Sequence, residues 1–92
     1  MTITVGELSF DNVVYDEDAD VLYLHVGDPA AAVGFDESPE GHALRYDVAG
    51  RLVGITIVNP RWLLEHDGTV TITLPQPVTV DRGMLAAAIG PP

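Results

Sequence analysis

The chain contains no cysteine and no lysine, and four arginines are its only permanently basic side chains. Without cysteine it can form neither a disulfide nor a thiolate metal site. The arginines, at positions 45, 51, 61 and 82, form no basic stripe. Because nucleic-acid binding depends on basic side chains that neutralise phosphates, we expect no binding to DNA or RNA. Anionic membrane surfaces are disfavoured for the same reason.

Long apolar stretches are missing as well. No run approaches the roughly 18 apolar residues of a membrane span. The segment Met1 to Glu7 shows neither the basic start nor the apolar stretch of a signal peptide. We therefore expect a soluble, cytoplasmic protein with no membrane association.

Acidic residues are abundant instead. Fourteen aspartates and glutamates stand against the four arginines, which gives a formal net charge of −10. Hydrophobic residues make up 47% of the chain, an ordinary share that excludes a disordered protein. The 92 residues fit a single domain, residues 1–92, with a thin hydrophobic core. Burying one face against a second copy would compensate for that thin core, so we expect a homodimer.

One short pattern occurs twice along the chain, in residues 14–24 and 45–55. Each copy has a strand that ends in Tyr-Asp, a tight turn, and a second strand of alternating polarity. This pattern predicts turn-linked β-hairpins. The side chains that share one face of the two second strands are expected in the core. They are Leu22, Leu24, Val26, Val53, Ile55 and Ile57.

Further strands are predicted on both sides of the repeat. Thr2 to Val5 and Leu8 to Phe10 alternate in polarity, with a bend at Gly6. Residues 30–35 are expected to form an edge strand and residues 36–42 an exposed loop. The second turn, Asp47 to Gly50, suits a type I turn in which Asp caps the amides and Gly takes a positive φ. In the first turn, we expect Asp16 to accept the following amides.

The remainder of the chain adds helices. Asn59 is a favourable N-cap and Pro60 a favourable first residue for a short helix that reaches His66. A strand is predicted over residues 69–74. A last helix, residues 82–89, would be capped by Asp81 and would dock through Met84, Leu85, Ala88 and Ile89. The predicted fold is α+β and mostly β: an antiparallel β-meander of hairpins with one or two short helices packed on the sheet.

Two segments resemble a family of small bacterial domains of unknown function. Tyr15-Asp16-x-x-Ala19-Asp20-Val21-Leu22-Tyr23 is similar to its YDxxADVLY segment, and residues 50–55 to a following YDxxGxLVGIEI-like segment. The resemblance implies a compact β-rich fold without an assigned activity. Some relatives lie beside toxin-like genes, which implies an antitoxin or accessory role. The chain departs from the family's usual form by extra residues before the first segment and by an extension from Asn59.

An acidic cluster in the first turn is the best candidate for a metal site. Asp16, Asp18 and Asp20 have the spacing of the first ligands of a calcium loop. The rest of such a loop is absent, because Val21 stands where glycine is needed and Gly27 where a bidentate glutamate is needed. Turn capping and solvation explain the same residues. Both interpretations remain open, with Asp16, Asp18 and Asp20 as the metal candidates.

The residues show no catalytic pattern. His25, His42 and His66 lack the spacing of zinc ligands. Asp20 or Glu40 with His42 could act as an acid–base pair, but no sequence feature places them within hydrogen-bond reach. The chain has no phosphate-binding glycine loop and no nucleophile elbow. We expect no enzymatic activity and no cofactor.

Arg61 and Trp62 are the best candidates for a binding contact, because Arg and Trp are enriched in interface hot spots. The alternative is that Trp62 plugs one end of the sheet. Tyr23 joins them as a candidate, because it lies on the strand face opposite Leu22 and Leu24.

The sequence therefore favours a non-enzymatic protein–protein interaction or structural module that acts as a homo-oligomer. One alternative is an antitoxin-like acidic partner of a basic toxin. The other is a metal-dependent enzyme or sensor that uses the acidic turn Asp16–Asp20.

Overall fold

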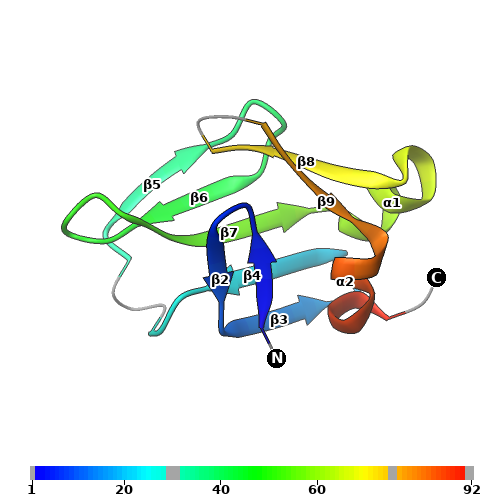
Figure 1. The fold of residues 1–92 in the computed structure, drawn as a ribbon, viewed down its shortest axis with the longest axis horizontal. Helices are drawn as coiled ribbons and strands as arrows, with labels where there is room; N and C mark the ends of the chain where they lie inside the picture. Colours follow the sequence, from blue (N-terminus) through cyan, green and yellow to red (C-terminus); the bar gives the residue numbers. More distant parts are fainter. Residues whose placement is uncertain (1, 29–31, 75–76, 91–92) are drawn as a thin grey trace.

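The computed structural model describes residues 2–28, 32–74 and 77–90, and its centre is a five-stranded antiparallel sheet (Figure 1). The strand order is β3-β4-β7-β6-β5. The strands are β3 (Asn12–Asp16), β4 (Val21–His25), β5 (Gly34–Glu37), β6 (Ala43–Tyr46) and β7 (Leu52–Val58). The second strands of the two repeats, β4 and β7, are therefore neighbours in the middle of the sheet.

A second layer covers one face of this sheet (Figure 1). It contains two hairpins, β1 (Ile3–Val5) with β2 (Leu8–Phe10) and β8 (Thr69–Thr73) with β9 (Pro77–Asp81). Helix α1 (Pro60–Asp67) follows β7 and contacts β8, and helix α2 (Arg82–Ile89) contacts β1, β3 and β9. The predicted class, α+β and mostly β with short helices packed on antiparallel hairpins, is confirmed.

The core lies between the two layers. Leu22 and Leu24 of β4 pair with Ile57 and Ile55 of β7, and all four side chains are buried. The second layer contributes the remaining buried apolar side chains together with Leu44 of β6. From the second layer these are Ile3, Val5, Phe10, Leu64, Val70, Ile72, Val80, Leu85 and Ile89.

Two of the six predicted core residues lie elsewhere. Val26 is 40% exposed and Val53 is partly buried. β4 ends at His25, and Gly27, with φ 67°, turns the chain away. Val26 donates its N–H to the Val53 carbonyl at 2.7 Å. The prediction for Val26 was wrong because the strand ends before the alternation does.

The two repeat turns behave as predicted. In the second, Gly50 has φ 82° and Asp47 Oδ1 accepts the amides of Ala49 and Arg51, both at 2.9 Å. In the first, Asp16 Oδ1 accepts the Ala19 amide at 3.2 Å. There the positive φ falls on Asp20, at 53°. Aspartate is one of the few residues that tolerate this conformation, so the first turn forms without glycine.

The segment between the repeats differs from the prediction. The edge strand β5 covers Gly34–Glu37, whereas residues 30 and 31 of the predicted strand lie outside the described residues. The loop expected to be exposed contains two buried side chains, Ser38 and His42. His42 Nδ1 accepts the Val58 amide at 3.1 Å, and Ser38 Oγ accepts the His42 amide at 3.1 Å. Partners on other elements therefore draw this loop inward.

Both predicted helices are present. Asn59 stands at the N-cap of α1, but its φ is 58° and its side chain makes no capping hydrogen bond. In α2, Leu85 and Ile89 are buried, whereas Met84 is 39% exposed. The predicted cap at Asp81 falls on a side chain outside the described part of the structure. Neither helix is long and apolar enough to cross a membrane, and the described residues form no other helix that is.

The buried His42 makes stability depend on pH. Burial lowers the pKa of His42 below its ordinary value of 6.5, although the nearby Glu40 carboxylate partly opposes this shift. The unfolded chain therefore binds the proton more readily, and acidification favours unfolding. We expect the free energy of unfolding to fall as the pH drops below 6.5. Denaturant unfolding between pH 7 and pH 5 measures this slope.

A comparison of two histidine variants checks the assignment. His42→Gln should flatten the slope, whereas replacement of the exposed His66 by glutamine should leave it in place. An unchanged slope in His42→Gln would contradict the role of His42.

Candidate functional site on the open face of the sheet

The outer face of the five-stranded sheet carries exposed apolar side chains. The helices and the two hairpins pack on the opposite face (Figure 1). On the outer face Val14 is 55% exposed, Tyr23 42%, Phe35 70% and Val58 38%. They arise because β-strands alternate their side chains, so each strand that contributes to the core also directs residues outward. We call this surface the open face.

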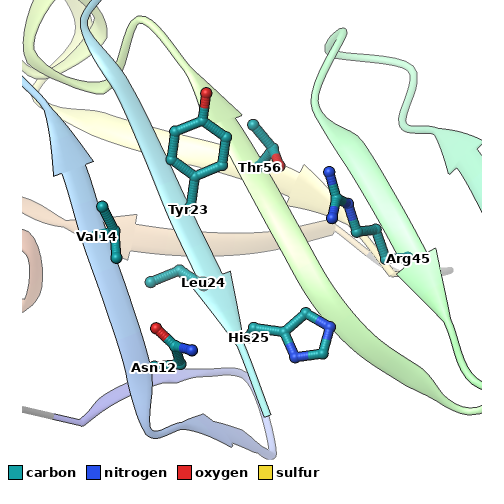
Figure 2. Close-up of a pocket in the computed structure, with 7 residues that line it drawn as sticks. All are labelled: Asn12, Val14, Tyr23, Leu24, His25, Arg45 and Thr56. Carbon is teal, nitrogen blue, oxygen red and sulfur yellow. The ribbon is translucent and has the colours of Figure 1, made fainter. Parts of the chain in front are cut away.

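Strand register aligns the residues of the open face in two rows. In one row, His25 lies opposite both Asn12 and Gly54, and Arg45 opposite both Gly54 and Phe35. The second row contains Val14, Tyr23, Thr56 and Ala43. Side chains of both rows line a hollow of about 240 Å³ (Figure 2).

His25 is the most buried side chain of the open face, at 5% exposure. Its Nδ1 lies 2.9 Å from the Val26 carbonyl oxygen, which can only accept, so Nδ1 carries a hydrogen. Its Nε2 is buried and has no hydrogen-bond partner within the described part of the chain. Gly54 makes room for the ring, since a Cβ there would lie 2.8 Å from His25 Cδ2. Any side chain at position 54 would therefore displace the imidazole.

Arg45 supplies the positive charge of the open face. Its guanidinium lies 5.6 Å from the centre of the Phe35 ring. No carboxylate among the described residues pairs with it, whereas Arg51 pairs with Asp47 at 3.0 Å. Neither His25 nor Arg45 was predicted from the sequence as a site residue. The available signal was the register, which aligns the two side chains only once β4, β7 and β6 are known to be neighbours.

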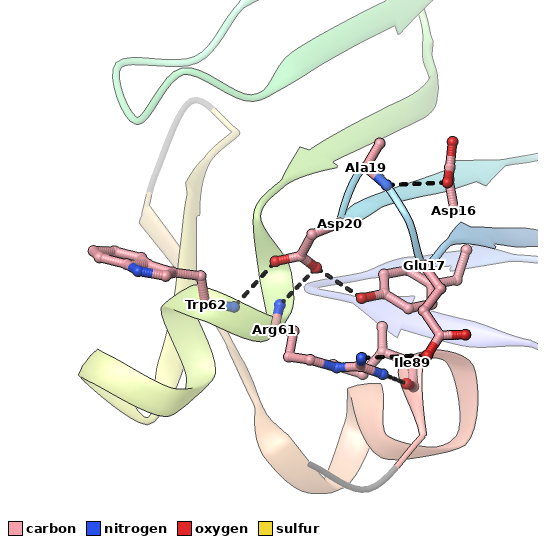
Figure 3. Close-up of polar contacts among 8 residues, drawn as sticks. Asp16, Glu17, Ala19, Asp20, Arg61, Trp62 and Ile89 are labelled. Carbon is pink, nitrogen blue, oxygen red and sulfur yellow. Dashed lines mark hydrogen bonds and ion pairs between the residues drawn. The ribbon is translucent and has the colours of Figure 1, made fainter.

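The acidic turn has a structural role at Asp20 (Figure 3). Asp20 Oδ1 accepts the Tyr15 hydroxyl at 2.8 Å and the Arg61 amide at 3.1 Å, and Oδ2 accepts the Trp62 amide at 3.1 Å. These amides belong to the first turn of α1, where N–H groups lack partners within the helix. Asp20 therefore caps α1 from a distant part of the chain. Burial and the hydrogen bond to Asp20 raise the pKa of the Tyr15 phenol to about 12.

The metal candidates Asp16, Asp18 and Asp20 are not brought together in a coordinating arrangement. Asp16 and Asp18 are exposed, and Asp20 uses both oxygens for Tyr15 and α1. Within the described ranges, no group of three or more His, Cys, Asp or Glu side chains is placed to hold a metal ion.

Arg61, one of the three interaction candidates, makes contacts within the protein. Its guanidinium donates to the Ile89 carbonyl at the end of α2 and lies 3.7 Å from Glu17 Oε1 (Figure 3). It also lies 5.4 Å from the centre of the Tyr15 ring. Arg61 therefore connects α1, the first repeat turn and α2.

Trp62 and Tyr23 lie on different surfaces. The Trp62 side chain is 53% exposed and stacks on His66, with ring centres 4.0 Å apart. The interpretation that Trp62 plugs the end of the sheet is therefore wrong. Tyr23 lies in the middle of the open face and lines the hollow (Figure 2).

The suggested acid–base residues have separate partners. His42 Nδ1 is engaged by the Val58 amide. The Glu40 carboxylate accepts the amide and the hydroxyl of Thr73, at 3.0 and 2.7 Å, and these bonds lower the pKa of Glu40. Asp20 lies in the cap of α1. The contacts of His42 and Glu40 fix the position of the 38–42 loop against β7 and β8.

Comparison with known proteins gives one family. The family model described as "Protein of unknown function (DUF2283)" matches residues 12–60, which extend from the start of β3 to the first residue of α1. The matched segment thus contains all five strands of the central sheet. Comparisons with curated proteins and with solved structures gave no match.

The Asp20 cap is testable by two substitutions. In Asp20→Gly, glycine tolerates the positive φ of this position, but the three side-chain hydrogen bonds are lost. This variant should lower the free energy of unfolding by about 2–3 kcal/mol. Asp20→Asn keeps one acceptor oxygen and tolerates the same backbone, so it should lose about half as much. Chemical denaturation measures both.

The decisive result is that Asp20→Gly has a lower free energy of unfolding than Asp20→Asn, and Asp20→Asn a lower one than the natural chain. If Asp20→Gly were as stable as the natural chain, the carboxylate would not hold α1.

Proposed function

The chain belongs to the family described as protein of unknown function (DUF2283), and from that premise we propose that it is a non-enzymatic interaction module. It pairs with a second copy of itself through the open face. The observation that carries this proposal is the set of exposed apolar side chains on that face, Val14, Tyr23, Phe35 and Val58. All four belong to the segment matched by the family.

The size of the open face supports a dimer of modest affinity. Five strands about 4.8 Å apart and about five residues long give a face of roughly 20 by 17 Å. Covering it in both copies removes on the order of 1,000 Å² of accessible surface, near the lower limit for a specific interface. A two-fold contact fits such a face because the same patch meets itself.

The composition of the face favours a second copy over other partners. Homodimer contacts are more apolar than the average protein surface, and four exposed apolar side chains give the open face this character. Arg45, for which the described residues offer no carboxylate, can meet one of the many acids of the second copy. In an acidic homodimer such a contact offsets part of the repulsion between the copies.

Val14→Glu tests the interface. It places a carboxylate on a side chain that is 55% exposed and makes no core contact, so the fold should remain while the dimer dissociation constant rises at least about tenfold. Val48→Glu is the matched control, because Val48 is 92% exposed in the second repeat turn, outside the open face. Sedimentation equilibrium of the two variants and the natural chain measures the effect.

Two results would remove the proposal: a natural chain that sediments only as a 9.8 kDa species at micromolar concentration, or equal effects of the two glutamates.

Salt dependence separates the homodimer from the antitoxin-like alternative. Two copies with a formal net charge of −10 repel each other, and salt screens that repulsion. The dimer should therefore become stronger as the salt concentration rises from low to physiological values. Binding to a basic toxin would weaken over the same range. Sedimentation at several salt concentrations measures the direction, and dimerisation that weakens with salt would contradict pairing through an apolar face.

A further inference from the structure

The hollow on the open face combines a buried imidazole, whose Nε2 has no partner among the described residues, with an arginine for which those residues supply no carboxylate. We propose that it binds a small organic acid, whose carboxyl group is held by His25 and Arg45. The apolar body of the acid lies against Val14 and Tyr23, which line the same hollow (Figure 2). The hollow lies within the face of the proposed dimer, but binding of the acid does not require a second copy.

His25 defines what the ligand must supply. Its Nδ1–H donates to the Val26 carbonyl, and none of the residues that the structure describes supplies a partner for the buried Nε2. A buried polar atom without a hydrogen bond costs about 1–3 kcal/mol, so a ligand that satisfies it gains that energy. A carboxyl group can do so with either form of the ring. As a carboxylate it accepts from a protonated Nε2, and as a carboxylic acid it donates to a neutral one.

Arg45 lies where it can reach the same acid group. The register places His25 and Arg45 on either side of Gly54. A Cβ at Gly54 would lie 2.8 Å from His25 Cδ2 and 3.2 Å from Arg45 Cβ, so both side chains flank this glycine. The His25 ring extends from β4 over β7 on the side of Arg45 (Figure 2).

The present contact of the Arg45 guanidinium with Phe35 is weaker than a bond to a carboxylate would be. Its contact with Phe35, at 5.6 Å from the ring centre, is worth about 0.5–1 kcal/mol at an exposed site. A charge-assisted hydrogen bond to a carboxylate is worth about 1.5–3 kcal/mol, and two parallel bonds add geometric specificity. Turning from Phe35 to a carboxylate in the hollow is therefore favourable.

Volume and charge restrict the ligand further. The hollow, about 240 Å³, is smaller than the roughly 300–1,000 Å³ of pockets that take drug-sized ligands. The net charge of −10 disfavours ligands that carry several negative charges. The expected ligand is a small monocarboxylate with a branched or aromatic body.

A titration with phenylacetate tests the site, with phenylacetamide as its neutral counterpart. The readout is the ¹⁵N shift of His25 Nε2 in histidine-labelled protein, assigned by its loss in His25→Gln. Phenylacetate should shift this resonance and leave that of His66 unchanged, and phenylacetamide should bind at least about tenfold more weakly.

Arginine variants identify the group that holds the acid. Arg45→Gln should weaken phenylacetate binding by about tenfold or more, and Arg45→Lys, which keeps the charge but not the planar fork, should weaken it less. Arg51→Gln, which removes an exposed arginine from another surface, is the matched control and should bind as the natural chain does. Circular dichroism checks that each variant is folded.

Three results would overturn the inference: no shift of His25 at saturating phenylacetate, equal binding of the acid and the amide, or equal binding by Arg45→Gln and Arg51→Gln. Sedimentation of the same samples measures the oligomeric state, so ligand binding and dimerisation are tested independently. A monomeric protein that binds phenylacetate supports the site and removes the dimer.

Discussion

The fold is organised around the pairing of β4 with β7. This pairing places Leu22 opposite Ile57 and Leu24 opposite Ile55, and these four buried side chains form the floor of the core. The same register determines the other face, because β-strands alternate their side chains. One pairing thus creates both the covered face that stabilises the fold and the open face that carries the hollow.

Asp20 links this sheet to the layer above it. The residue forms the first repeat turn with a positive φ and caps α1 with its carboxylate. Its backbone carbonyl also accepts the Asn59 amide, at 2.8 Å. From α1, Arg61 reaches the last carbonyl of α2. Asp20 belongs to an acidic cluster that suggested a metal site, but its role is to hold the first repeat turn, the sheet and the helices together.

Local patterns predicted the elements, and long-range contacts decided most of what was missed. The alternation in the repeats predicted β3, β4, β6 and β7, and the Asp-to-Gly spacing predicted the second turn, because both depend on neighbouring residues. No local pattern gives the strand order. The cap of α1 comes from Asp20 and not from Asn59, and His42 is buried because Val58 supplies a partner. Arg61 and Trp62 point to different surroundings because adjacent helical residues lie about 100° apart.

The family match ends where the second layer begins, and this has a consequence for the isolated segment. Residues 12–60 contain the five strands but neither flanking hairpin and only the first residue of α1. In this chain, β1 and β2 on one side of the segment and α1, β8, β9 and α2 on the other cover the apolar side chains of Leu22 and Ile57. As an isolated fragment, this segment would expose apolar side chains on both faces of the sheet instead of one. Self-association would bury them, so we expect the fragment to associate.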